Sequence, residues 1–187
     1  MLDASKLPLA NEVARLRELT HADAAAYAAG TEDAAVRAYA HLPAPEYTTE
    51  SVIEMIDGEV GLGLDRGDLA VLAVAHEATN EFAGSLVLFD LTDAQAEVGF
   101  WVHPASRGRG MSGAALELAA RFSQLSGLSK LTARTVIDNA GSQRVLAAAG
   151  FELIGSASGT TPSGDVAELL HYELSLPSKE AQSTRTR

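Results

Sequence analysis

Residues 98–113 read VGFWVHPASRGRGMSG, and this stretch passes from an apolar run through a segment rich in glycine and arginine into an alanine-rich segment. The β-branched and aromatic residues of 98–102 favour a strand. From Met111 onward apolar residues recur at helical spacing, and Gly127 follows as a C-terminal cap. The stretch therefore predicts a strand, a loop and a helix in direct succession.

The loop inside this stretch has the features of an anion-binding site. Its glycines let the backbone approach a ligand closely, and the first N–H groups of the following helix lack internal partners and carry partial positive charge. Arg107 and Arg109 add guanidinium groups suited to phosphate oxygens. Neither a Walker P-loop nor a Gly-x-Gly-x-x-Gly dinucleotide fingerprint is present. The alternative interpretation is a solvated turn that binds nothing.

Composition limits the class of protein. The chain has 187 residues, of which 47% are hydrophobic, so it predicts one domain with a substantial core. Its 14 Lys+Arg against 25 Asp+Glu give a formal charge of -11, which argues against nucleic-acid and anionic-membrane partners and favours an amine substrate. The absence of cysteine excludes disulfides, a thiol nucleophile and a thiolate metal site, and a cytoplasmic location is the simplest expectation.

No targeting or membrane-spanning segment is predicted. The first residues lack the pattern of a signal peptide, and no run approaches the roughly 18 apolar residues of a membrane span. We divide the chain into an N-terminal lead-in (1–11) that is expected to be loose, a single domain (12–176) and a polar tail (177–187) that is expected to be disordered.

Strand patterns recur on both sides of residues 98–113. The predicted strands are Val13–Leu19, Leu69–Ala75, Phe82–Phe89, Ala96–Val102, Lys130–Ile137, Phe151–Ser158 and Val166–Leu176. Because a full helix separates the fourth strand from the fifth, these two are expected to run parallel. The last two are expected to form a hairpin around residues 160–164.

Helices are predicted from capping residues and glycine stops. Thr20 begins one that ends at Gly30, and residues 31–40 form a second short helix. Thr49 or Ser51 caps a third that ends at Gly58. Residues 31–67 carry the weakest pattern of the chain.

A second motif lies one helix and one strand after the loop. Asn139, Ser142, Gly150 and Phe151 form the pattern Asn-x-x-Ser, a short helix and then Gly-Phe. Taken alone, this describes a capped helix with a glycine stop. Its order and spacing relative to the loop make a functional interpretation stronger.

Together the two motifs resemble those of the GNAT N-acetyltransferases. The loop matches their acyl-CoA pattern Arg/Gln-x-x-Gly-x-Gly/Ala, with Ser112 in place of the last Gly/Ala. Residues 16–23 resemble the opening strand and helix of the branch that includes bacterial RimJ/RimL-type ribosomal-protein N-terminal acetyltransferases. Residues 96–104 resemble the fourth strand of that branch. Residues 168–172 resemble its closing strand, in which aspartate is more usual than Glu168. The resemblance covers about 12–176 and is weakest at 31–67.

The resemblance implies an α/β (α+β) fold: a mixed, mostly antiparallel sheet of about seven strands, with a V-shaped split between the fourth and fifth strands and about four helices. It also implies acetyl-CoA as co-substrate, with no metal. The pantetheine amides would pair with backbone near Phe100 to His103, and the pyrophosphate would lie on the loop. The cofactor-binding residues it implies are Phe100, Trp101, Val102, His103, Arg107, Gly108, Arg109, Gly110, Met111, Ser112, Asn139 and Ser142.

Ser142 and Glu97 are the candidate catalytic residues. The position that often holds a tyrosine acid in relatives is Leu146, and a frequent lysine is replaced by Ala148, so Ser142 is the next candidate to assist the leaving thiolate. Glu97 would take the amine proton directly or through water, or else it is simply an outward polar residue of its strand.

Other polar and aromatic residues have simpler interpretations. For His103 a turn position without a side-chain role is favoured, and Phe100 and Trp101 are core or lining residues. His21, His41, His76 and His171 lack metal-ligand spacing. We therefore expect no metal.

The function these residues predict is acetyl-CoA-dependent acetylation of a primary amine, above all a peptide or protein N-terminal α-amine. The alternatives are a small-molecule amine such as an amino acid, polyamine or antibiotic, or a non-catalytic acyl-CoA-binding module. The expected partners are acetyl-CoA and the amine acceptor, with no nucleic acid and no membrane. The oligomeric state stays open, with a homodimer as one option.

Overall fold

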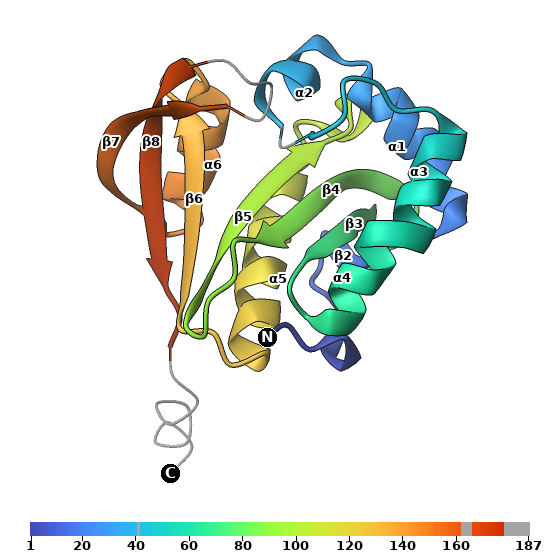
Figure 1. Ribbon diagram of the computed structural model, residues 1–187, viewed down its shortest axis with the longest axis horizontal. Helices are drawn as coiled ribbons and strands as arrows, with labels where there is room; N and C mark the ends of the chain where they lie inside the picture. Colours follow the sequence, from blue (N-terminus) through green and yellow to red (C-terminus); the bar gives the residue numbers. More distant parts are fainter. Residues whose placement is uncertain (41, 162–165, 178–187) are drawn as a thin grey trace.

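The computed structural model describes residues 1–40, 42–161 and 166–177, and within them eight strands form one sheet in the order β1-β2-β3-β4-β5-β6-β8-β7 (Figure 1). The strands are β1 (Leu9–Ala10), β2 (Ala14–Glu18), β3 (Ala70–His76), β4 (Phe82–Phe89), β5 (Gln95–Val102), β6 (Lys130–Val136), β7 (Glu152–Thr160) and β8 (Val166–Ser175). Neighbouring strands are antiparallel except β5 and β6, which run parallel. The predicted mixed, mostly antiparallel sheet is confirmed.

Helices cover both faces of the sheet (Figure 1). One layer contains α1 (Ala24–Thr31), α2 (Ala34–Tyr39), α3 (Thr49–Met55) and α4 (Gly61–Arg66), and the other contains α5 (Met111–Leu125) and α6 (Ala140–Ala148). The helix α5 contacts β1 to β6, and Phe122 on it is fully buried in the larger of two hydrophobic clusters. The smaller cluster lies under α1, α2 and α3, where it includes Tyr27 and Trp101.

The sheet splits between its two parallel strands. Pairing between β5 and β6 runs from Gln95↔Lys130 to Glu97↔Thr132 and then stops, while β5 stays paired with β4 as far as Val102. Figure 1 shows β6 and β8 leaning away from β5 beyond this point. The predicted split is thus confirmed, and residues 98–102 present a strand edge whose backbone groups are open to an extended ligand.

The N-terminal residues are not the loose lead-in that the sequence predicts. Leu2 and Leu9 are buried, and the Asp3 N–H donates to Ser126 Oγ at the end of α5 (3.0 Å). Leu9 and Ala10 form β1 on β2, which is the strand beyond the expected seven. Two residues are too few to show the alternation that identifies a strand.

Several helix ends also differ from the prediction. The helix α1 continues through Gly30, where a Cβ atom would lie 2.6 Å from the Trp101 ring, so close packing explains this glycine. Thr48 caps α3, with Ser51 closing the capping box. Within the π-helical segment Ile56–Val60 the chain kinks at Gly58, whose φ of -101° and ψ of -114° are not helical, so the predicted helix end at Gly58 agrees with the backbone; helical structure resumes after the kink and continues through α4. The chain turns at Gly67, whose φ of 73° suits glycine.

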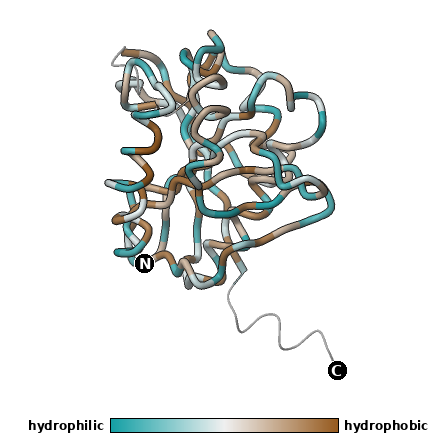
Figure 2. Tube along the Cα trace, turned by 90° about the vertical axis from the view of Figure 1, so that its right-hand side faces the viewer, coloured by the Kyte–Doolittle hydropathy of each residue, from teal (hydrophilic) through white to brown (hydrophobic). Residues whose placement is uncertain are grey.

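None of the helices in the described ranges has the length and apolar character needed to cross a membrane. Figure 2 agrees, because hydrophobic and hydrophilic residues alternate along the trace. The tail from 178 onward, His41 and residues 162–164 of the predicted hairpin turn lie outside the described residues.

Candidate active site

The loop between β5 and α5 leaves a helix N-terminus open. A short 3-10 turn, Pro104–Ser106, is followed by Gly108 and Gly110, whose φ angles of 73° and 76° favour glycine. No side chain caps α5. Its first N–H groups are therefore available to an anion.

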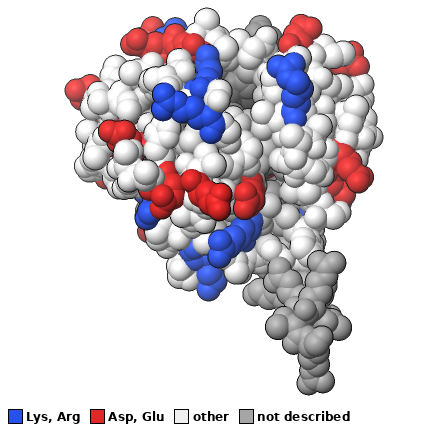
Figure 3. All heavy atoms as spheres, turned by 180° about the vertical axis from the view of Figure 1, so that it is seen from behind, with Lys and Arg blue, Asp and Glu red and all other residues white. Residues whose placement is uncertain are grey.

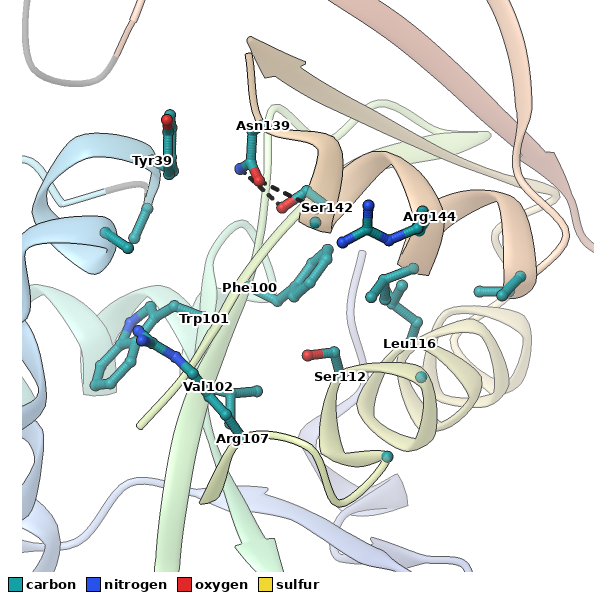
Figure 4. A pocket seen from close by; sticks show the side chains of 18 of the residues that line it. Tyr39, Phe100, Trp101, Val102, Arg107, Ser112, Leu116, Asn139, Ser142 and Arg144 are labelled. Atoms are coloured by element: carbon teal, nitrogen blue, oxygen red, sulfur yellow. Dashed lines mark hydrogen bonds between the residues drawn. The ribbon is translucent and has the colours of Figure 1, made fainter. Parts of the chain in front are cut away.

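A cavity of about 1060 Å³ lies beside this loop, between α2, β5, α5 and α6 (Figure 4). It is large enough for an extended cofactor. The predicted cofactor residues that line it are Phe100, Trp101, Val102, Arg107, Gly108, Gly110, Ser112, Asn139 and Ser142. We call it the cofactor cavity.

Three predicted cofactor residues are not brought to this cavity. The His103 backbone N–H donates to the Ala83 carbonyl (2.8 Å), and its ring Nδ1 accepts from the Ala105 N–H (3.3 Å). Met111 is buried in the core, and Arg109 lines a separate depression with His103. A linear motif does not tell on which side of a loop each side chain lies.

Arg107 joins the loop to α2. Its guanidinium donates to Asp33 (2.6 Å to Oδ1), which also caps α2 by accepting from the Ala35 and Val36 N–H groups. The hydrogen bond from Arg107 is the main reason why the pKa of Asp33 is lowered. A phosphate bound at the loop would therefore compete with Asp33 for this guanidinium.

Tyr39 and Arg144 are among the lining residues that the sequence motifs did not predict. Arg144 adds a second guanidinium to the wall, and helical spacing from Gly141 and Ala148 on α6 was the signal that could have found it. Figure 3 shows basic side chains on both sides of a hollow on this face. Tyr39 faces Asn139 and Ser142 from α2 (Figure 4), in a region where the sequence carried little pattern.

A second, smaller cavity of about 280 Å³ occupies the split between β5 and β6. We call it the split cavity. Tyr39, Phe100 and Ser142 line both it and the cofactor cavity, so the two meet at these side chains. A thioester held in the first cavity and an amine held in the second would come together at this junction.

Asn139 holds Ser142 at the junction. The Asn139 side chain accepts from the Ser142 N–H (3.1 Å) and donates from Nδ2 to Ser142 Oγ (2.9 Å), as the dashed lines in Figure 4 show. Because Ser142 Oγ accepts this bond, its own hydrogen remains free to be donated to a ligand. Asn139 therefore caps α6, as expected of a purely structural motif, and it also holds the Ser142 hydroxyl at the junction.

Glu97 lines the split cavity, yet its carboxylate is engaged. Both of its oxygens accept from Arg134 Nε (2.8 and 2.9 Å), and this contact raises the pKa of Arg134. Both carboxylate oxygens of Glu97 are thus already occupied by Arg134, which leaves them less available to contact an incoming amine directly. Of the two alternatives for the amine proton, the geometry favours a water ordered by Glu97.

Two further observations concern Leu146 and the acidic and histidine side chains. Leu146 is 1% exposed and forms part of the wall of the split cavity. In the part of the chain that the structure describes, no group of three or more His, Asp or Glu side chains is arranged to hold a metal ion.

Comparison with known families gives the class. The protein-family model described as "Acetyltransferase (GNAT) domain" matches residues 14–152 of this chain. The chain belongs to the GNAT acetyltransferase family, and it is an N-acetyltransferase that uses acetyl-CoA. No curated protein matches the chain at the level required to count as a relative.

Solved structures with the same fold include ribosomal-protein acetyltransferases. Mycobacterium smegmatis RimJ in complex with CoA-disulfide has a TM-score of 0.74 at 20% identity, with 96% of this chain and 88% of that chain covered. The Salmonella typhimurium enzyme that modifies the N-terminal serine of ribosomal protein L7/L12 has a TM-score of 0.75 at 19% identity, with 89% of this chain and 97% of that chain covered. The microcin C7 self-immunity acetyltransferase MccE, in complex with acetyl-CoA and AMP, has a TM-score of 0.78 at 17% identity, with 92% of this chain and 99% of that chain covered.

Proposed function

We propose that this enzyme acetylates the α-amine of a peptide or protein N-terminus. The observation that carries the proposal is the junction at Ser142, where the cofactor cavity meets the split cavity. This arrangement suits direct transfer from thioester to amine, since a thioester in one cavity and an amine in the other would meet at the side chains that the two cavities share.

In this proposal the residues at the junction handle two protons. The attacking amine loses its proton to a water ordered by Glu97 as the new C–N bond forms. The C–S bond then breaks, and the Ser142 hydroxyl donates a hydrogen bond to the leaving thiolate. Such a thiolate is a tolerable leaving group because thiols have a pKa near 8.5. Proximity therefore supplies most of the acceleration and Ser142 a smaller part.

An α-amine suits a site with a weak base. It titrates near pH 7.7 to 8, whereas a lysine side chain titrates near 10.4, so at neutral pH an α-amine is already partly uncharged. The enzyme that modifies the N-terminal serine of L7/L12 supports this acceptor by analogy of fold.

A panel of acceptors tests the proposal. CoA release is measured with unblocked peptides, with the same peptides acetylated at the N-terminus but carrying a lysine, and with small amines. We expect the unblocked peptides to have the highest kcat/KM. Equal or faster turnover of lysine side chains would overturn the assignment to an α-amine.

A small-molecule amine is the second candidate. The split cavity is small, and MccE, in complex with acetyl-CoA and AMP, shares the fold. If free amino acids, polyamines or amine antibiotics exceed every peptide in the panel, this candidate replaces the first.

The variant Ser142→Ala is expected to lower kcat by roughly tenfold, a fraction of the hundred- to ten-thousand-fold that acid-base catalysis supplies. The KM for acetyl-CoA and the melting temperature should stay unchanged, because Asn139 still caps α6 through the Ser142 N–H. Ser129→Ala, which removes an exposed hydroxyl that donates to the Ala94 carbonyl and lines neither cavity, is the matched control. If Ser142→Ala leaves kcat unchanged, or acts only by weakening CoA binding, Ser142 is a positioning residue.

A further inference from the structure

A third cavity, of about 260 Å³, lies between the sheet and the layer that contains α1, α3 and the helical segment Ile56–Val60. Val71, Ser85 and Val87 of β3 and β4 form its floor, and Met55 and Val60 lie on the opposite side. Tyr27, Tyr47 and Trp101 form an aromatic wall, so we call it the aromatic cavity. Neither the cofactor nor the proposed catalytic residues account for it.

Apart from Glu59 at the edge, the aromatic cavity is lined by uncharged side chains. Tyr27 packs against Tyr47 and Trp101, with ring centroids 5.6 and 5.2 Å away. Burial raises the pKa of both Tyr27 and Tyr47, so both phenols stay neutral. Polar atoms have partners, since Tyr47 Oη accepts from the Ala44 N–H (3.2 Å) and Ser85 Oγ donates to the Leu72 carbonyl (3.1 Å).

The aromatic cavity borders the site of transfer. Gly99 and Phe100 of β5 line both the aromatic cavity and the split cavity. Phe100 also lines the cofactor cavity, so one strand position borders all three spaces. The aromatic cavity is therefore the neighbouring space for a group attached close to an amine at the Ser142 junction, with Gly99 and Phe100 between the two.

We propose that the aromatic cavity binds an apolar side chain, aliphatic or aromatic, from the first or second residue of the acceptor. This inference rests on the proposed peptide acceptor and specifies its class. The lining lacks a positive charge among the described residues, and Glu59 at the edge is exposed and carries a negative charge. The same cavity therefore discriminates against acidic side chains.

The first experiment compares short peptides that differ only at the first or second residue, with alanine, leucine, phenylalanine or glutamate there. At saturating acetyl-CoA, leucine or phenylalanine at one of the two positions is expected to raise kcat/KM by about 10- to 100-fold over alanine, and glutamate to lower it. Rates that agree within about twofold across the panel overturn the inference and leave the proposed acetylation of α-amines intact.

Filling the cavity supplies the structural control. In Val87→Phe, and in Val71→Phe as a second variant, kcat/KM for the leucine and phenylalanine peptides should fall to the value for the alanine peptide. The KM for acetyl-CoA should not change. The same replacement at the exposed Val13 is the matched control. A preference that survives in the folded Val87→Phe and Val71→Phe variants contradicts the placement.

Trp101 provides a readout that does not depend on catalysis. It is the single tryptophan of the chain and lines the aromatic cavity. Because it also lines the cofactor cavity, peptides are titrated with CoA already saturating. A change in tryptophan emission with leucine or phenylalanine peptides, absent with glutamate peptides and in Val87→Phe, supports the inference even if turnover fails. No change with any peptide overturns it.

Discussion

Replacing Arg107 with Glu and Gly110 with Asp together is expected to weaken acetyl-CoA binding by 100-fold or more, on the scale of about 1.5 to 3 kcal/mol for each lost charge-assisted hydrogen bond. The two carboxylates repel the phosphates from the N-terminus of α5, where no side chain competes for the first N–H groups. Isothermal calorimetry with acetyl-CoA measures the loss. Circular dichroism checks that the domain stays folded.

The matched control for this variant is Arg109→Glu. It makes the same charge change in the same loop, but Arg109 lines a separate depression and not the cofactor cavity. We expect its affinity for acetyl-CoA to stay within about threefold of the parent, since an exposed charge in water acts weakly at a distance. A folded double variant that binds normally, or an Arg109→Glu variant that loses binding equally, would show that the phosphates lie elsewhere.

Asp23→Ala is expected to destabilise the protein by about 3 to 5 kcal/mol, which lowers the melting temperature by roughly 6 to 20 °C. The Asp23 side chain is 5% exposed and forms a bidentate pair with Arg17 (2.7 and 2.8 Å), so its removal leaves the Arg17 charge largely buried without its partner. It also removes the acceptor of the Thr20 N–H at the start of the first helical turn (2.9 Å). Thermal unfolding followed by circular dichroism measures the effect.

Asp68→Ala is the control, because its pair with Arg66 has the same kind of contact (2.8 Å) with both side chains more than half exposed. Its removal is expected to lower the melting temperature far less than Asp23→Ala does, because a solvent-exposed ion pair adds little stability. Similar losses in the two variants would contradict the assignment of a buried, stabilising pair to Arg17 and Asp23.

The stabilisation that Asp23 provides depends on pH in a definite direction. Burial alone would raise the pKa of Asp23, but hydrogen bonds from Arg17 and Thr20 outweigh burial and lower it. In the unfolded chain an aspartate titrates near pH 3.9, so the stabilisation is fully present above that pH and declines as the pH falls towards the lower folded pKa. The difference in melting temperature between the parent and Asp23→Ala should therefore narrow in acid.

Much of the fold could be predicted because its elements carry local signals. The strand, loop and helix of residues 98–125 follow from apolar spacing and glycines, and Gly127 does adopt the left-handed conformation expected of a cap (φ 92°). The parallel pairing of β5 and β6 follows from the full helix between them. The GNAT family was likewise readable from the loop and the Asn139 motif, since both depend on residues close in sequence.

The candidate site was predicted less completely, because the sequence does not reveal the direction in which each side chain points. Arg107 and Arg109 stand two positions apart in one motif, but only Arg107 lines the cofactor cavity, where Asp33 already binds it. Glu97 occupies the expected strand, but Arg134 of β6 already binds both of its carboxylate oxygens. These contacts join residues distant in sequence, which local patterns do not encode.

By itself, the sequence determined the order of most strands and helices, the anion-binding loop, the absence of a catalytic tyrosine at position 146 and the acidic balance of the chain. These properties depend on residue identity and short-range spacing. Only the tertiary structure decided that β1 completes the sheet, that Tyr39 faces Ser142, and that three cavities meet along β5 at Phe100. The physical reason is that cavities arise where several elements fail to fill the space between them, and that depends on how all of their side chains pack together.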